Sequence, residues 1–297
     1  MRGRPGRPST GTMNDFVPVA LRDNFYQTSA FVPMSFALVT TVHEDGTTGI
    51  GSHALCFPFG IAKPYSMLLI SRSTSGTANN LRRTGKCALN YLEFDRDQLT
   101  AIARLGLPGQ SLEDKQRAMP FSLVPSQDPG RAADPECPRV VAEAFQVLEC
   151  HWDRSFALDR APAGATEAGA SRFVLAIDHL WMKEPFTATL EAGGPFPDMP
   201  VFFGFRNPGD FWFAPHAEPF SVPLPKVEGL EVQGIFYLAN RLDPAVRFNR
   251  EACALLASVP KPFVKNALEG IVKAAKAAGV AEVDEAFMQA VRSRPGR

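Results

Sequence analysis

The sequence contains no apolar run that approaches the ~20 residues of a membrane-spanning helix. It also has no excess of either charge, because 31 Lys and Arg residues are balanced by 31 Asp and Glu residues. Proteins that hold nucleic acid by neutralising its phosphates need a positive surface, which a zero net charge does not supply. The arginines near the N-terminus have no apolar stretch behind them, so a secretory signal is not indicated. We therefore expect neither a nucleic acid nor a membrane as a partner.

Cysteine is scarce as well. The five cysteines are odd in number and widely spaced, and no two of them form a C-x-x-C pair. Such spacing indicates neither a disulfide framework nor a zinc site. We expect no metal site in this chain and a reducing, cytoplasmic location.

Tyrosine and tryptophan are few, with 4 and 3 residues against 23 phenylalanines, whereas prolines number 26. A chain rich in Phe and Pro favours short strands and irregular connections over long helices. The 297 residues, 45% of them apolar, suffice for one large domain or two modest ones at roughly 100–200 residues each.

Local patterns predict a β-rich first half of the chain. Residues 36–42 are strong strand formers, and the Asp45-Gly46 pair that follows them is the best short-range hairpin signal. His43 lies beside this turn and is expected to be exposed to solvent. The predicted strands are 36–42, 47–57, 66–71, 87–92, 145–158, 172–183, 201–205 and 211–214. The predicted helices are 77–83, 98–105, 112–118, 250–258, 263–278 and 284–292, and no internal repeat is apparent.

The segment from Ser71 to Leu81 leaves a buried strand and enters a helix, and its turn is rich in hydroxyl side chains. The first turn of a helix offers unpaired N–H donors and the positive end of the helix dipole, which suit a phosphate group. Arg72 adds a charged donor. A plain N-cap at Thr77 after a serine-rich turn explains the same residues. Neither a Walker loop nor a G-x-G-x-x-G fingerprint occurs, and both interpretations stay open at this point.

Residues 21–185 resemble the flavin reductase-like, FMN-binding split-barrel family. The matching features follow in the right order: Ala37-Leu38-Val39-Thr40-Thr41 before Asp45-Gly46, the strand Gly49 to Phe57, the strand Met67 to Ser71 before Ser75-Gly76-Thr77 and Asn80-Leu81, and Thr84-Gly85 before Cys87-Ala88-Leu89-Asn90. The resemblance implies a mainly β fold with helices (α+β). It also implies an antiparallel, six-stranded split β-barrel that binds FMN at the interface of a homodimer.

The resemblance also implies a set of cofactor-binding residues. Glycines at 49 and 51 would let a flat ring lie close to the backbone. The flavin ring is expected against Gly51, Ser52, His53, Ala54 and Leu55, and the phosphate near Ser71, Arg72, Ser73, Ser75, Gly76, Thr77 and Asn80. The apolar Ala54-Leu55 pair departs from the hydroxyl-rich strand that is usual in the family. No catalytic residue is identified, although His53 and His216 are candidates.

The expected domain organisation has four parts. Residues 1–14 are a disordered tail, 15–185 the FMN-binding split barrel, and 186–248 a Phe- and Pro-rich extension that packs on the barrel. Residues 249–297 form a small helical C-terminal module. Within it, residues 253–291 are similar to the C-terminal helical module of one subunit of the light-independent protochlorophyllide reductase, through Val259-Pro260, Phe263-Val264 and Glu285-Ala286-Phe287-Met288.

Three functions are compatible with this reading. The first is an NAD(P)H-dependent flavin reductase, with FMN or alternatively FAD as cofactor and NAD(P)H as co-substrate, in which a hydride passes from the nicotinamide to flavin N5. The second is an FMN-bound oxidase, oxygenase or reductase of an organic substrate. The third is a non-catalytic flavin-binding electron-transfer module. A partner oxygenase or redox protein is a further expectation.

Overall fold

The computed structural model describes most of the chain as two compact units, residues 1–219 and 220–297. The described residues are 16–22, 24–32, 34–61, 63–105, 119–156, 158, 169–192, 194–207, 210–222, 230–259 and 261–292. The predicted tail over 1–14 and the predicted helix over 112–118 lie outside them. No helix in these described ranges is long and apolar enough to cross a membrane.

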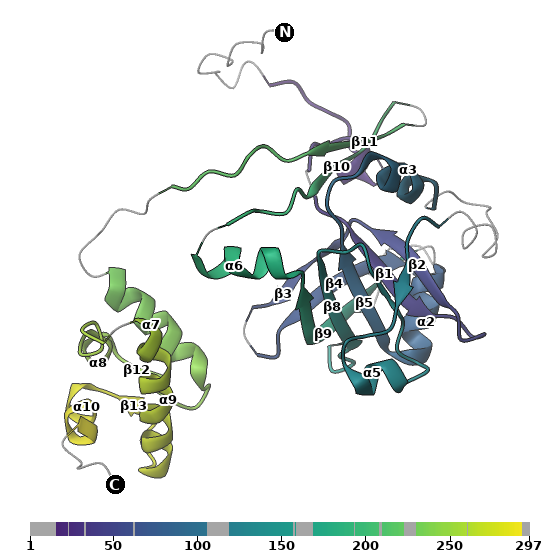
Figure 1. Cartoon of the computed structure of the whole chain (residues 1–297). Coiled ribbons are helices and arrows are strands. Elements are labelled where there is room, and N and C mark those ends of the chain that lie inside the picture. The colour runs from purple at the N-terminus through teal and green to yellow at the C-terminus, as the bar shows by residue number, and fades with distance from the viewer. Residues whose placement is uncertain are drawn as a thin grey trace. The chain divides into compact units, whose positions relative to one another are not determined.

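The first unit is built on a curled, antiparallel sheet of seven strands (Figure 1). The strands are β1 (Ala37–Val42), β2 (Thr48–His53), β3 (Cys56–Gly60), β4 (Ser66–Arg72), β5 (Lys86–Tyr91), β8 (Gln146–Trp152) and β9 (Ala170–Met182). Their order in the sheet is β2-β1-β5-β8-β9-β4-β3. Curling brings the two ends of the sheet order near each other, since β2 contacts β4.

The seventh strand arises because the strand predicted over 47–57 is broken. β2 pairs with β1, whereas β3 pairs with β4 at the opposite end of the sheet order. The chain therefore crosses from one end of the curled sheet to the other at Ala54 and Leu55, and the carbonyl oxygen of Leu55 already accepts a hydrogen bond from the N–H of Ile70 in β4 at 2.9 Å. The strand predicted over 145–158 is also too long, since β8 ends at Trp152.

Hydrophobic side chains pack on both faces of the sheet. On one face, Leu81 of α2 (Gly76–Thr84) packs with Val39, Leu89 and Phe173. On the other face, Leu38 and Ala88 pack with α3 (Arg96–Leu105). All six residues of β1 are consequently buried, although an alternating strand usually exposes every second residue.

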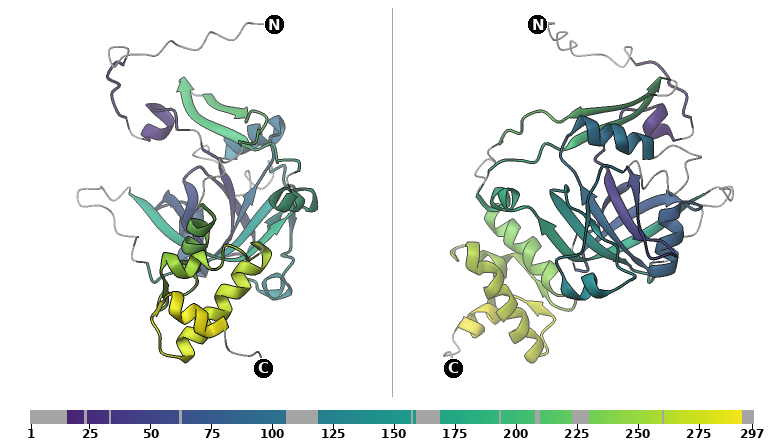
Figure 2. Two further views of the ribbon diagram at one scale, coloured as in Figure 1. Left: turned by 90° about the vertical axis from the view of Figure 1, so that its left-hand side faces the viewer. Right: turned by 45° about the vertical axis from the view of Figure 1, so that its right-hand side comes forward.

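Short elements surround the sheet. They are α1 (Phe25–Thr28), β6 (Leu123–Val124), α5 (Pro129–Ala133), β7 (Val140–Val141), α6 (Glu184–Ala192), β10 (Pro200–Asn207) and β11 (Asp210–Pro215). The β10–β11 hairpin lies beside α3 in both further views (Figure 2). Phe202, Phe211 and Phe213 of this hairpin pack in the same cluster as Ile50 and Ala54, so part of the Phe-rich segment shares a hydrophobic core with β2.

The second unit contains two helix–strand–helix motifs. They are α7 (Leu230–Leu242), β12 (Arg247–Phe248) and α8 (Arg250–Ala254), then α9 (Lys261–Ala277), β13 (Glu282–Val283) and α10 (Glu285–Arg292). β12 and β13 pair in parallel, and an Asx residue follows each of them. Asn249 and Asp284 both accept a hydrogen bond at 2.8 Å from the backbone N–H three residues later. The likeness of the two motifs lies in the order of their elements and in this shared cap, and the sequence shows no repeat that corresponds to it.

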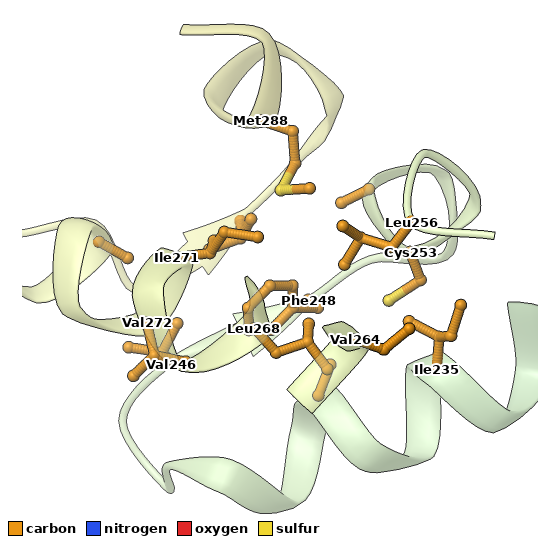
Figure 3. Close-up of a cluster of buried hydrophobic side chains, with 14 residues drawn as sticks. Ile235, Val246, Phe248, Cys253, Leu256, Val264, Leu268, Ile271, Val272 and Met288 are labelled. Carbon is orange, nitrogen blue, oxygen red and sulfur yellow. The ribbon is translucent and has the colours of Figure 1, made fainter. Parts of the chain in front are cut away.

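The second unit begins earlier than the sequence suggests. Its core includes Ile235 of α7 together with Phe248, Leu268 and Met288 (Figure 3). The unit starts after Pro219, so the expected boundary at 248/249 falls inside it. The composition shift near residue 250 marks the start of α8, and α7 belongs to the same core.

Candidate functional site

The start of α2 is shaped by Ser75, which is the N-cap of the helix. Its hydroxyl accepts a hydrogen bond from the N–H of Ala78 at 3.0 Å, and its carbonyl oxygen accepts one from Asn79 at 3.0 Å. Gly85, with a φ of 70°, ends the helix in the left-handed conformation. The cap is thus two residues before Thr77, where the simple N-cap interpretation had placed it.

Several donors converge at this helix start. The Ser71 and Ser75 hydroxyl oxygens are 2.7 Å apart, so β4 and α2 present neighbouring hydroxyl groups. Among the described hydrogen bonds, none uses the backbone N–H of Gly76 or Thr77, as expected for the first two positions of a helix. Arg72 is exposed beside them. Because one of the two hydroxyl groups donates to the other, one hydroxyl proton and the two N–H groups remain as donors, and with the neighbouring Arg72 in the chain they fit a phosphate.

Thr77 and Asn80 are among the expected cofactor-binding residues, and in the structure both side chains attach α2 to the sheet. The Thr77 hydroxyl lies 3.1 Å from Nε2 of His53 in β2. The Asn80 amide nitrogen donates to the Thr41 hydroxyl at 3.0 Å and lies 3.1 Å from Nδ1 of His43. These contacts fix the direction of α2, and hence of its N–H groups, relative to β1 and β2. Ser73 is half-buried, and its carbonyl oxygen is held by Arg82 at 2.7 Å.

Two histidine rings occupy the space beside the glycines of β2. A Cβ atom on Gly49 would lie 2.1 Å from Nε2 of His43, and one on Gly51 would lie 2.5 Å from Oγ1 of Thr77 and 2.9 Å from Nε2 of His53. The glycines therefore make room for the protein's own side chains, and the approach of a flavin ring to this strand stays a prediction. Glycines at alternate positions of one strand were the only sequence signal of these close contacts.

The structure contradicts the expectation that His43 is an exposed turn residue. Its ring is partly buried between Gly49 and α2, and this burial lowers its pKa. An amide N–H of Asn80 points at Nδ1, which assigns the proton of the neutral ring to Nε2. Sequence reasoning missed this residue because its neighbours come from a helix more than thirty positions away.

His53 is expected to make the protein less stable as the pH falls. Loss of water around the ring lowers the pKa of His53 to about 4, below the ~6.5 of an exposed histidine. Between these two values the unfolded chain binds a proton that the folded chain does not, so stability is present above pH ~6.5 and is lost as the pH falls toward 4. Urea unfolding at neutral and acidic pH measures this slope.

The matched variant is His53→Gln, which keeps a polar partner for Thr77 but does not titrate. Its loss of stability on acidification is expected to be smaller than that of the wild type. Some dependence of the stability of this variant on pH is expected to remain, because the pKa of His43 is also lowered. An acid-induced loss equal to that of the wild type would contradict the assignment to His53.

His216, the second catalytic candidate, belongs to a different part of the first unit. Nε2 of His216 lies 2.8 Å from the carbonyl oxygen of Pro197, and Nδ1 lies 2.6 Å from that of Ala217. The described hydrogen bonds do not connect it with β2 or α2. The structure therefore does not join His53 and His216 in one catalytic group.

A second cluster of charged groups lies between α5 and the sheet. Glu149 of β8 is 1% exposed, and its carboxylate accepts a hydrogen bond from Nε1 of Trp181 at 2.8 Å. Nε of Arg131 lies 3.7 Å from this carboxylate, and Nδ1 of His179 lies 3.5 Å from it. Arg131 also binds Asp178 at 3.0 Å. These contacts hold α5 against β8 and β9, so the cluster is structural.

Known proteins share this arrangement of strands. No family model matches the chain, and no curated protein matches its sequence. A protein from Shewanella frigidimarina, described as a flavin reductase with a split barrel domain, is 15% identical over 65% of this chain and 87% of its own, with a TM-score of 0.50. The chain has the split-barrel flavin reductase fold. The resemblance stated from the sequence is thereby confirmed as a fold.

Two other split-barrel structures extend the comparison. Flavoredoxin from Methanosarcina acetivorans is 15% identical over 72% of this chain and all of its own, with a TM-score of 0.51. The 2-nitrobenzoate 2-nitroreductase of Pseudomonas fluorescens is 13% identical over 73% of this chain and 97% of its own, with a TM-score of 0.51. At these identities the split-barrel likeness concerns the fold alone. No comparison supports the expected similarity of residues 253–291 to protochlorophyllide reductase.

Proposed function

We propose that this chain is a flavin-dependent oxidoreductase that binds FMN, with the flavin phosphate at the start of α2. The carrying observation is the donor set of Ser71, Ser75 and the N–H groups of Gly76 and Thr77, next to Arg72. A flavin phosphate carries up to two negative charges, which suit both the guanidinium and the positive end of the helix dipole. FAD is the alternative cofactor, because the same donors fit its pyrophosphate.

The chain's own groups have three tasks in this proposal. The hydroxyl and N–H groups of the α2 start bind the phosphate, and Arg72 neutralises its charge. The neutral His53 holds Thr77 and so keeps the first turn of α2 in place. The segment from Ser52 to Leu55 lies next to α2, and we place the flavin ring there. A bound flavin supplies hydride chemistry, for which no described side chain is suited.

Among the possible reactions, we propose NAD(P)H-dependent flavin reduction first. Support comes from the split-barrel fold, which this chain shares with a protein described as a flavin reductase. A stopped assay of NADH or NADPH consumption with added FMN tests it, and the expected result is flavin-dependent oxidation of one nicotinamide. Tightly held FMN that neither nicotinamide reduces would favour the other two functions, electron transfer or turnover of an organic substrate.

Reduction of an organic substrate is the second candidate. It is favoured by the β10–β11 hairpin, whose phenylalanines belong to the hydrophobic cluster against which Ala54, just after β2, also packs. An apolar cover at this place suits a substrate that is itself apolar. Flavin-dependent consumption of nicotinamide only in the presence of a nitroaromatic compound would favour this function over flavin reduction.

Arg72→Ala is expected to weaken FMN retention by about three- to tenfold, as for loss of one charge-assisted contact in an exposed position. Arg72 is exposed and makes none of the described hydrogen bonds or ion pairs, so the fold is expected to keep its stability. Fluorescence titration with FMN measures the change. Riboflavin, which lacks the phosphate, is the matched control, and an equal loss of riboflavin binding would contradict the phosphate assignment.

We also propose that the protein is a homodimer. β3 is at the edge of the sheet order, and its Phe57 and Phe59 are 39% and 41% exposed, with Tyr65 nearby in the chain at 50%. Exposed aromatic side chains on an edge strand favour burial against another chain. Light scattering of the purified protein is expected to give twice the mass of the chain, and a monomer at all concentrations would contradict the proposal.

A further inference from the structure

A pocket of about 310 Å³ lies in the first unit, away from the α2 start. Three segments form it: the bridge residue Met34 with Ser35, the stretch from Phe196 to Val201, and the turn from His216 to Pro219. Met34 and Phe202 exchange two backbone hydrogen bonds, at 3.0 and 3.5 Å, which hold the first segment against β10. The volume is at the lower end of the ~300–1,000 Å³ that is usual for small-molecule sites.

The walls of this pocket are almost entirely apolar. Methionine, phenylalanine, proline and valine side chains line it, and Ser35 and His216 are the two exceptions among the lining residues. Methionine sulfur packs favourably against aromatic rings, and proline offers a rigid surface. Such walls favour a flat, aromatic molecule over a sugar or a peptide.

The histidine gives the pocket a positive charge. Both ring nitrogens of His216 face carbonyl oxygens, that of Pro197 at 2.8 Å and that of Ala217 at 2.6 Å. A carbonyl oxygen only accepts hydrogen bonds, so these two contacts favour the ring that carries a proton on both nitrogens, the imidazolium. These two carbonyl groups raise the pKa of His216.

The acidic groups around His216 leave this charge available to a ligand. The carboxylate of Asp198 contributes to the raised pKa of the His216 ring. Glu93 accepts a hydrogen bond from the backbone N–H of Asp198, and Glu218 is two residues after His216 in the chain. All three are exposed to solvent, and none lines the pocket. Water and salt screen these carboxylates, and His216 is itself largely open to solvent, so its attraction for an anionic ligand is that of a screened surface charge.

We propose that this pocket binds a flat aromatic molecule with one negative charge, of the aryl carboxylate class. The rings would lie between the apolar walls, and the carboxylate would face the His216 imidazolium. The charge attraction here is between ions, because both N–H groups of the ring are already bonded to carbonyl oxygens. This site does not depend on the proposed flavin binding, since no residue of the α2 start contributes to it.

Calorimetric titration of the full chain with 2-naphthoate and with 2-naphthylmethanol tests the proposal. The carboxylate is ionised throughout the range from about pH 6 to 9, whereas His216 loses its proton as the pH rises through its raised pKa. The naphthoate is expected to bind about two- to fivefold more tightly at the lower pH, the effect of one screened ion pair. The neutral alcohol is expected to bind equally at both values.

Two variants distinguish the contribution of the apolar walls to binding from that of the His216 charge. Val201→Trp fills the pocket and is expected to weaken both ligands at least tenfold, while FMN titration stays as in the wild type. His216→Phe keeps a flat ring without charge and is expected to abolish only the advantage of the naphthoate at low pH. The wild-type pH series needs no variant, so it decides the matter if His216→Phe does not fold.

Three outcomes would overturn the proposal. The first is that neither ligand binds the wild type. The second is that Val201→Trp binds both ligands as well as the wild type does, and the third is that naphthoate binding to the wild type does not depend on pH. Because FMN is titrated in parallel, failure of this site and failure of the flavin proposal are distinguishable.

Discussion

Arg131→Met is expected to lower the free energy of unfolding by about 3–5 kcal/mol, the usual cost of removing one partner of a buried ion pair. Glu149 is 1% exposed, and its carboxylate faces Arg131, Trp181 and His179. Methionine fills similar space but leaves the carboxylate without its permanent counter-charge. The same substitution also breaks the 3.0 Å ion pair with Asp178. Urea unfolding followed by circular dichroism measures the loss.

A double variant shows whether the loss comes from the unpaired charge. Arg131→Met combined with Glu149→Leu removes both charges, and it is expected to recover most of the stability, because paired replacement by apolar residues is often nearly neutral. If Arg131→Met alone stays within about 1 kcal/mol of the wild type, then the cluster does not hold α5 on the sheet in the way described.

Ser75→Asp is expected to weaken FMN binding about 10- to 100-fold, because two like charges brought together cost several kcal/mol and each 1.4 kcal/mol is tenfold. Asp caps a helix as well as Ser does, so the hydrogen bond to the N–H of Ala78 is kept and α2 is expected to remain intact. The substitution thus adds a negative charge at the phosphate position with little change in the fold. Fluorescence titration with FMN gives the affinity.

Ser75→Asn is the matched control, since asparagine is an equally good cap without charge. It is expected to bind FMN within about threefold of the wild type, as for loss of one neutral hydrogen bond. Riboflavin affinity is expected to be the same in the wild type and in both variants. If Ser75→Asp and Ser75→Asn bind FMN equally well, the phosphate does not lie at the start of α2.

The sequence predicts the elements whose cause is local. The strand at residues 37–42, the Asp45-Gly46 turn and the helix that Gly85 ends all follow from propensity and turn chemistry within a few residues. The split of 47–57 into β2 and β3 does not, because it depends on which distant strand each half pairs with. Local patterns therefore predict individual elements, whereas the split-barrel fold was implied by the family resemblance, and the seventh strand was not predicted at all.

The candidate site likewise has features with a local cause, which the sequence predicts, and features that depend on distant residues, which it does not. The hydroxyl-rich turn with Arg72 is visible as a motif, and the structure brings Ser71 and Ser75 together there. The inward-facing roles of Thr77 and Asn80 depend on histidines that come from the β1–β2 hairpin. The partners of Glu149 are spread from Arg131 to Trp181, and no sequence pattern links residues at such separations.

Equilibrium dialysis of the full chain against FMN and against riboflavin tests the central claim most directly, since the two differ only in the phosphate. The structure predicts that the protein retains one FMN per chain and that it holds riboflavin about tenfold or more weakly, as for loss of a phosphate bound by a helix start and a guanidinium. Retention of neither flavin, or equal retention of both, would contradict the assignment of the phosphate to the start of α2.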